Sequence, residues 1–155
     1  MPKREIKLIA KNRTAHHEYE FEETYEAGVV LTGTEVKSIR ERSAQITDSF
    51  CIVRDGEVWM LNVHIHPYSH GGVWNVDPDR RRKLLLHRRQ IDTLEGKLRN
   101  KGLALVPLKI YFDEHSRVKV QLGLGRGKKL YDKRADLKKR QTDRDIQRAL
   151  KERSR

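Results

Sequence analysis

Apolar and polar residues alternate in several segments of the chain, which is the period of a β-strand with one buried face. In the clearest segment the alternating apolar residues are Val118, Val120, Leu122 and Leu124. Residues 103–112 show a similar alternation, but Pro107 cannot donate to a ladder, so we expect an edge or a bulge there. Residues 113–116 between the two segments predict a hairpin turn.

Further strands are predicted where aromatic and β-branched residues gather, at residues 18–25, 28–31, 50–54 and 57–63. Asp55-Gly56 lies between the last two segments, and this dipeptide is a strong signal for a two-residue hairpin. Gly28 lies within a Val- and Tyr-rich run and indicates a bulge.

Two short helices are predicted between the strands, at residues 35–42 and 88–100. In the second, Ile91, Leu94 and Leu98 share one face, and Gly102 ends the helix. Many short strands with short appended helices predict a mainly β fold, and an OB-like Greek-key barrel is the first choice. Such barrels often bind oligonucleotides, but the fold alone does not establish a function.

The charge of the chain changes this picture most. The 155 residues carry a formal net charge of +12, with a sequence pI near 10.0. Apolar residues make up 36%, which allows only a small core. A solvated polyanion is the natural partner of such a surface, so nucleic acid is the favoured ligand; the alternatives are a soluble basic enzyme or a protein that is simply basic.

The positive charge is concentrated at the C-terminal end. Residues 126–155 hold 13 Lys or Arg against five Asp or Glu, and few apolar residues follow Tyr131. We therefore expect a folded body at residues 1–124 and a basic tail at 125–155. Ile146, Ala149 and Leu150 form a short helical stripe, which predicts a tail that is disordered when free and helical against RNA. The alternative is a solvated tail that only aids solubility.

The compartment is indicated by what the sequence lacks. A single cysteine excludes an internal disulfide and fits a reducing compartment. The first residues hold no apolar core of a secretory signal, and no segment has the roughly 20 apolar residues of a membrane span. We expect a cytoplasmic protein without a membrane partner.

Candidate chemistry is weak. Residues 123–129 resemble a phosphate-binding loop, but Leu122 stands where its first Gly is needed and Lys129 where Ser or Thr is needed. A flexible basic hinge is the better interpretation of this segment. Three histidines, His64, His66 and His70, lack the supporting ligands of a metal site, and His16-His17-Glu18 is too short to indicate a nuclease. We expect no catalytic residue, no metal and no cofactor.

A cluster of cations, Arg80 to Lys83, follows the turn Asp77-Pro78-Asp79. Four successive cations favour contact with phosphate. A solvated loop or a nuclear-import signal would have the same composition, and these alternatives remain open.

Several motifs, in order along nearly the whole chain, resemble the small protein B family of SsrA-binding proteins. They are Glu26-Ala27-Gly28, Gly33 to Ser38, His64 to Gly71, Asp77-Pro78 with Arg80 and Arg82, Lys83 to His87, Gly102 to Leu108 and Leu122 to Arg134. No single motif is decisive, but the ordered set is specific.

The resemblance implies an OB-like barrel that binds the tRNA-like part of transfer-messenger RNA. It implies entry of the pair, with one copy of the protein, into a ribosome stalled with no codon in its decoding centre. The body would stand in for the missing anticodon stem, and the tail would occupy the empty messenger path of the small subunit. No chemistry would be done by the protein.

The same resemblance puts RNA contacts at Asn12, Glu26 and Leu85, although the pattern of residues alone would assign Leu85 to the core. Further RNA contacts are expected at His17, Tyr19, Lys37, Arg80, Arg82 and Lys83. Tail contacts with the ribosome are expected at Gly127, Lys128, Lys129, Tyr131, Asp132, Lys133, Arg134, Lys138, Arg140, Arg144, Ile146 and Leu150.

Two competing hypotheses remain. A general ribosomal or RNA-chaperone protein would explain the charge but not the ordered motifs, and it would be present on every ribosome. An RNA-processing enzyme would cleave RNA with a metal or a histidine, and the sequence offers little for that chemistry.

Overall fold

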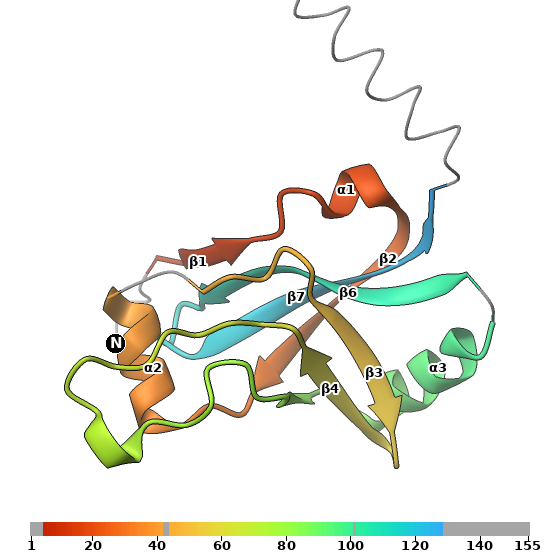
Figure 1. Cartoon of the computed structure of the whole chain (residues 1–155). Helices are drawn as coiled ribbons and strands as arrows, with labels where there is room; N and C mark the ends of the chain where they lie inside the picture. The colour runs from red at the N-terminus through yellow and green to blue at the C-terminus, as the bar shows by residue number, and fades with distance from the viewer. Residues whose placement is uncertain (1–4, 42–43, 101, 129–155) are drawn as a thin grey trace, which may run out of the picture.

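The computed structural model describes residues 5–41, 44–100 and 102–128. Within these residues, seven strands and three α-helices follow each other, with one 3-10 turn, η1, before β5 (Figure 1). In order they are β1 (Lys7–Lys11), α1 (Ala15–Glu18), β2 (Tyr19–Val29), α2 (Gly33–Glu41), β3 (Phe50–Arg54), β4 (Glu57–Leu61), η1 (Gly72–Trp74), β5 (Arg82–Leu85), α3 (Arg88–Leu98), β6 (Leu103–Phe112) and β7 (Val118–Gly127).

All pairings between the strands are antiparallel, and they close the sheet into a barrel. The order β6-β3-β4-β5-β2-β7 returns to β6, because β6 also pairs with β7 along its length. The other edge of β6 is shared by two strands. Strand β1 pairs with it near Phe112, and β3 pairs with it at the single pair Cys51–Leu105. The mainly β fold with short appended helices is therefore confirmed.

The core fills the inside of the barrel. Every strand contributes inward side chains to it, but the N-terminal end of β1 is exposed. The most deeply buried apolar side chains include Val58, Met60, Leu84, Leu105, Val120, Leu122 and Leu124. Helix α3 adds Ile91 and Leu94 to this core, and α2 adds Ile39. Each such side chain stabilises the fold by about 1.5–3 kcal/mol relative to exposure.

A second, smaller apolar cluster lies outside the barrel, where α1 packs on β6. It consists of Ala15, Val106 and Leu108, with Tyr19, Phe21 and Ala104 against them. The cluster requires glycine at position 123 of β7, because a Cβ there would lie 2.6 Å from Phe21 Cδ1. The close approach of β2 to β7 requires a second glycine, since a Cβ on Gly125 would lie 2.4 Å from Glu20 O. The interpretation of residues 123–129 as a flexible hinge is therefore wrong as far as Gly127, because β7 continues through it.

Both predicted hairpins are confirmed. Asp55 and Gly56 have positive φ, as the two-residue turn requires, and residues 113–117 connect β6 to β7. The bulge expected at Pro107 is also present, since the register with β7 shifts between Pro107 and Lys109.

Other local predictions were wrong. The two strands predicted at residues 18–25 and 28–31 are one strand, β2, which runs from Tyr19 to Val29, and its bulge lies between Phe21 and Glu23, not at Gly28. The sequence patterns did not reveal β1, β5 or α1. Strand β7 also continues past residue 124, so pairing extends beyond the expected boundary of the body.

Candidate nucleic-acid interface

The register of the sheet brings side chains from five strands onto one outer face of the barrel. Directly paired residues of antiparallel strands point to the same side. One row across the sheet consists of Leu8, Tyr111, Lys119, Gly28 and Leu85. The next row consists of Lys11, Lys109, Gln121 and Glu26. These two rows are called the outer face below.

The centre of the outer face is a hydrogen-bonded pair of side chains, Glu26 and Tyr111. The Tyr111 hydroxyl donates a hydrogen bond to Glu26 Oε2, and the Lys109 ammonium lies 5.6 Å from the centre of the Tyr111 ring. Burial, and then the hydrogen bond to Glu26, raise the pKa of Tyr111, so the hydroxyl remains a donor. The Glu26 side chain is exposed, and Tyr111 fixes its direction.

Apolar side chains flank these polar groups. Leu85 is 52% exposed and Leu8 is 54% exposed, at opposite ends of one row. The core position that the pattern favours for Leu85 is wrong, because β5 alternates and it is Leu84 that points inward. Gly28 leaves room for Leu85, since a Cβ on Gly28 would lie 3.4 Å from Leu85 Cβ.

The composition of the outer face suits RNA. Lys11, Lys109 and Lys119 provide three cations for phosphate, against the single carboxylate of Glu26. A carboxylate accepts hydrogen bonds from base amino groups and ribose hydroxyls but not from phosphate oxygens. Exposed leucines can pack on a base or a sugar. The polar positions of the 103–127 hairpin could have been found from its alternation, whereas their partners on β1 and β2 could not.

His17 and Tyr19 lie in a different place, at the point where the chain leaves the barrel. Tyr19 pairs with Gly127, and Lys128 N donates to Glu18 O at 2.9 Å. His17 is half-buried, and its Nδ1 has no hydrogen-bond partner within residues 5–41, 44–100 and 102–128. These two residues are adjacent to the start of the tail and remain candidates for contact.

Asn12 requires a correction, because its side chain is buried. Its Nδ2 donates to Pro107 O at 3.1 Å, its Oδ1 accepts from Thr14 Oγ1 at 3.3 Å, and its backbone N donates to Leu108 O at 2.8 Å. Asn12 therefore holds the β1–α1 connection against the bulge of β6. A direct contact of its side chain with RNA is not available in this structure.

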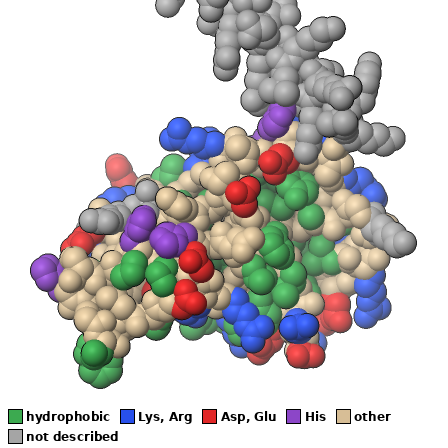
Figure 2. Space-filling view, in the orientation of Figure 1, with side chains coloured by type: hydrophobic (Ala, Val, Ile, Leu, Met, Phe, Trp, Pro, Cys, Tyr) green, Lys and Arg blue, Asp and Glu red, His purple; other side chains and the backbone are tan. Residues whose placement is uncertain are grey.

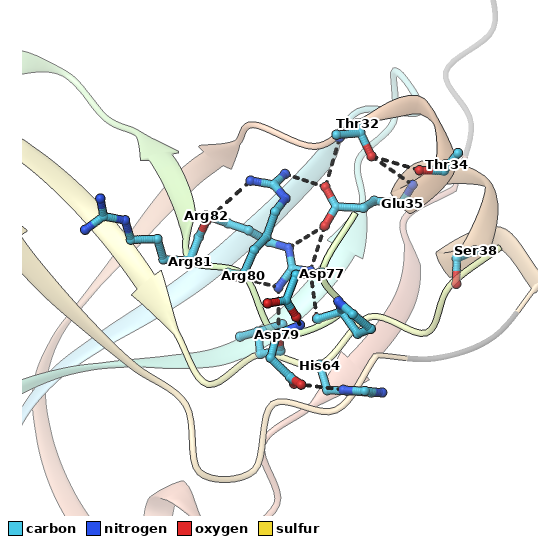
Figure 3. A network of polar contacts seen from close by, with 12 residues as sticks. Thr32, Thr34, Glu35, Ser38, His64, Asp77, Asp79, Arg80, Arg81 and Arg82 are labelled. Carbon is cyan, nitrogen blue, oxygen red and sulfur yellow. Dashed lines mark hydrogen bonds and ion pairs between the residues drawn. The ribbon is translucent and has the colours of Figure 1, made fainter. Parts of the chain in front are cut away.

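Arg82 requires the same correction. Its side chain is 0% exposed and donates to Glu35 Oε2 at 2.7 Å, Val63 O at 2.6 Å and Pro78 O at 2.9 Å (Figure 3). The phosphate contact expected of Arg82 is therefore wrong. A buried guanidinium needs partners for its donors, and here they are one carboxylate and the backbone of the long connection between β4 and β5.

Glu35 is the centre of this network. Its carboxylate also accepts from Arg80 and, at 2.9 Å, from Thr32 N. Burial by itself would raise the pKa of Glu35, but the hydrogen bonds from Arg80 and Thr32 and the charge of Arg82 outweigh it and lower the pKa. Glu35 N in turn donates to Thr32 Oγ1 at 3.3 Å, so the pair caps the start of α2.

The remaining cations of the cluster are more accessible. Lys83 pairs with Glu57 at 2.9 Å, and Arg81 lies 4.9 Å from the centre of the Trp59 ring. The Arg80 side chain is 27% exposed. Lys37 is exposed on α2, away from this cluster, and its ammonium lies 5.7 Å from the centre of the Tyr68 ring.

The histidines contact each other and one carboxylate. His64 and His66 meet edge to face at 4.8 Å, and His64 Nδ1 lies 2.8 Å from Asp79 Oδ1. Within the described part of the chain, no group of three or more His, Cys, Asp or Glu could hold a metal. In the same residues no helix is long and apolar enough to cross a membrane.

Most of the predicted tail residues lie outside the described residues. These are Lys129, Tyr131, Asp132, Lys133, Arg134, Lys138, Arg140, Arg144, Ile146 and Leu150. Gly127 ends β7, and Lys128 follows it beside α1.

A small antiparallel barrel with a basic outer face defines a class of nucleic-acid-binding proteins. The model of the SmpB protein family matches residues 9–152. An SsrA-binding protein of Geobacillus sp. (strain WCH70) is 56% identical over 153 residues, covering 99% of this chain and 98% of the relative. An SsrA-binding protein of Fervidobacterium nodosum is 51% identical over 146 residues, covering 94% and 98%. This chain belongs to the SmpB family.

A solved structure agrees with this assignment. It is described as "tmRNA-SmpB: a journey to the center of the bacterial ribosome" and has 55% sequence identity and a TM-score of 0.65. The match covers 78% of this chain and 85% of that chain.

Proposed function

We propose that this chain binds the tRNA-like domain of transfer-messenger RNA and delivers it to stalled ribosomes for trans-translation. The observation that carries the proposal is the near full-length similarity to relatives named for binding SsrA, at 51% and 56% identity. The solved relative is likewise described with tmRNA and the bacterial ribosome. One copy of the chain acts with one RNA in the cytoplasm.

The outer face is the proposed place of RNA binding. Lys11, Lys109 and Lys119 contact phosphates, which gives most of the affinity and makes it depend on salt. Glu26, oriented by Tyr111, accepts from a base or a ribose hydroxyl. Leu85 packs against an exposed base or sugar. An outer sheet face with one positioned carboxylate suits recognition of the shape of a folded RNA better than recognition of a base sequence.

The chain acts by binding alone. The body takes the position of an anticodon stem, and the basic residues after Gly127 follow the empty messenger path of the small subunit. Arg80 and Lys83 stand at the edge of the body and Lys37 on α2, as further contacts to phosphate. His17 and Tyr19 lie where the body meets the tail, so they contact RNA near the decoding centre.

A gel-shift titration tests the proposal. The protein is titrated with the tRNA-like domain at moderate salt and in excess competitor tRNA. Binding in the nanomolar range, about −12 kcal/mol, is expected to survive the competitor. Loss of the shift would leave a general basic RNA-binding barrel, and equal occupancy of stalled and translating ribosomes would favour a general ribosomal protein.

The variant Glu26→Ala tests the outer face. It should weaken RNA binding by roughly tenfold, about 1.4 kcal/mol, and leave the melting temperature nearly unchanged because Glu26 is exposed. Glu22→Ala, on the same strand and also exposed, is the matched control. A large fall in melting temperature would make Glu26 a structural residue.

A further inference from the structure

A hollow beside α2 is not used by the outer face. It has a volume of about 500 Å³ and is lined by Thr34, Lys37, Tyr68, His70 and Trp74, among others. It lies between the start of α2 and the long connection from β4 to β5, which Figure 1 shows reaching past α2. The name aromatic hollow is used for it below.

The aromatic hollow contains exposed rings that the core does not need. Trp74 is 78% exposed, and its neighbour Val73 is 93% exposed. Figure 2 shows hydrophobic side chains projecting at the end of the molecule where Figure 1 draws this segment. Tyr68 and His70 meet edge to face at 5.5 Å within the hollow. Exposed aromatic groups gathered in a hollow mark a binding surface.

The walls of the hollow are built by specific contacts. Asn75 accepts from Tyr68 N and donates to Tyr68 O, both at 3.0 Å, which braces the loop behind the rings. Gly71 is needed there, since a Cβ would lie 2.5 Å from Asn75 Oδ1. Thr34 Oγ1 donates to Trp74 O at 3.3 Å, and Ser38 Oγ donates to His66 O at 2.5 Å, so α2 is tied to the same loop.

The charge around the hollow is positive. The Lys37 ammonium lies 5.7 Å from the centre of the Tyr68 ring, and the Lys37 side chain is exposed. Glu35, behind the hollow, is buried and neutralised by Arg80 and Arg82. The hollow therefore combines flat rings, a cation and the hydroxyl of Thr34. This set suits an aromatic ligand with an attached anion better than an apolar peptide.

We propose that the aromatic hollow binds an unpaired nucleobase, stacked on Trp74, with its phosphate on Lys37. Unpaired bases that stack on aromatic side chains are a common mode of RNA recognition. Only Val30, Leu31 and Thr32 separate β2, which carries Glu26 of the outer face, from α2. The start of α2, which lines the hollow, is therefore close in the chain to the strand that carries Glu26. The inference rests on the proposed function and adds a contact with an unpaired base to it.

Fluorescence tests the site directly. The chain has two tryptophans, so Trp59→Phe leaves Trp74 as the single reporter. Addition of an unpaired oligoribonucleotide should quench Trp74 and protect it from acrylamide, whereas a blunt RNA duplex should not. Lys37→Ala in the same background should weaken the effect. Equal quenching by duplex and unpaired RNA would overturn the inference. Because this test does not use transfer-messenger RNA, its outcome does not depend on the proposed function.

Affinity measurements identify the source of the base. If it belongs to transfer-messenger RNA, Trp74→Ala weakens binding of the isolated tRNA-like domain by roughly tenfold or more, while Trp74→Phe is nearly normal. If it belongs to ribosomal RNA, the loss appears only on stalled ribosomes. The matched control is Val73→Ala, because Val73 is still more exposed than Trp74 but does not line the hollow.

Two outcomes would overturn the inference while leaving the proposed function intact. One is wild-type affinity of Trp74→Ala for both the isolated RNA and the stalled ribosome. The other is a photo-crosslink from position 74 to a ribosomal protein instead of RNA. Failure of the wild-type protein to bind the tRNA-like domain above competitor would instead remove the proposed function.

Discussion

Single residues show that a charge in the sequence is not always a charge on the surface. Arg82 lies in a run of four cations, yet its side chain has no exposed area because Glu35 and three backbone carbonyls surround it. The neighbouring Arg81 is exposed. Alternation along β5 decides which of these cations points inward, and a run of identical charges conceals that alternation.

The variant Glu35→Gln tests how much this network contributes to the stability of the fold. Removing one partner of a buried ion pair costs about 3 kcal/mol or more, so the free energy of unfolding at pH 7 should fall by that order. Folding lowers the pKa of Glu35 from 4.5, so its contribution is present above about that pH. The contribution is lost as the pH falls through the folded pKa. Denaturation of the wild type and of Glu35→Gln at pH 7 and at acidic pH measures whether their free energies of unfolding converge as the pH falls.

The control for this variant is Glu57→Gln. Glu57 pairs with Lys83 on the surface, where both side chains are about two-fifths exposed. Its loss should change the free energy of unfolding by less than about 1 kcal/mol. A difference between Glu35→Gln and the wild type that stays constant down to acidic pH would show that ionisation of Glu35 is not the cause.

The site residues differ in whether their importance could be predicted from the sequence around them. Glu26 and Leu85 were named from the family resemblance, and the structure exposes both on one face. The pattern alone favoured a core position for Leu85, because it follows another leucine in a short apolar run. Lys119 and Lys109 were not named, since their importance depends on which strands pair beside them.

At the scale of elements, strand β7 depends on glycines, although in the sequence these glycines favoured a flexible hinge. Gly125→Ala should lower the free energy of unfolding by about 1–3 kcal/mol, because the new Cβ would lie 2.4 Å from the Glu20 carbonyl oxygen. Gly127→Ala should be nearly neutral, since nothing lies within 4 Å of its Cβ position. Urea denaturation of the two variants compares them, and equal stabilities would contradict the close approach of β2 and β7.

Elements with local signals were predictable and others were not. The two hairpins carry their own turn residues, Asp55-Gly56 and residues 113–116. Strands β1 and β5 have only five and four residues, and each forms because distant partners offer an open edge. Neither partner is visible within a short window of sequence.

The outer face is a property of paired strands, and salt dependence tests it at that scale. Lys119→Ala should weaken binding of the tRNA-like domain and reduce the slope of log affinity against log salt by about 1. Arg99→Ala removes the same charge at the end of α3, away from the two rows, and should leave the slope unchanged. Titrations at several salt concentrations measure both. Equal slopes for the two variants would exclude Lys119 from phosphate contact.

At the scale of the whole molecule, the end of β7 sets where the chain can be cut. Residues 125–127 pair with β2 and β6, so a stop codon after Gly125 would damage the barrel. A protein ending at Lys128 should keep the wild-type melting temperature and its affinity for the isolated RNA. It should fail to support tagging on stalled ribosomes. Loss of RNA affinity in this truncated protein would place part of the binding surface beyond Lys128.

The class of fold was predictable because many short alternating segments fit few architectures. Closure of the barrel was not, since it depends on one pair, Cys51–Leu105, and on two strands that share an edge of β6. The aromatic hollow also emerged only from the structure, because its walls come from α2 and from a loop more than 30 residues further along the chain.

The sharing of β6 has a consequence for synthesis of the chain. Strands β1 and β2 leave the ribosome early, but their partners β6 and β7 end at Phe112 and Gly127. At about 5–20 residues per second, the interval from the end of β4 at Leu61 to Gly127 takes roughly 3–13 s. When β4 is complete only the β3–β4 hairpin has its partner; β5 then adds to β4 and β2, and β6 and β7 come last. The nascent chain therefore exposes unpaired edges of β2 and β6 until its last strand emerges.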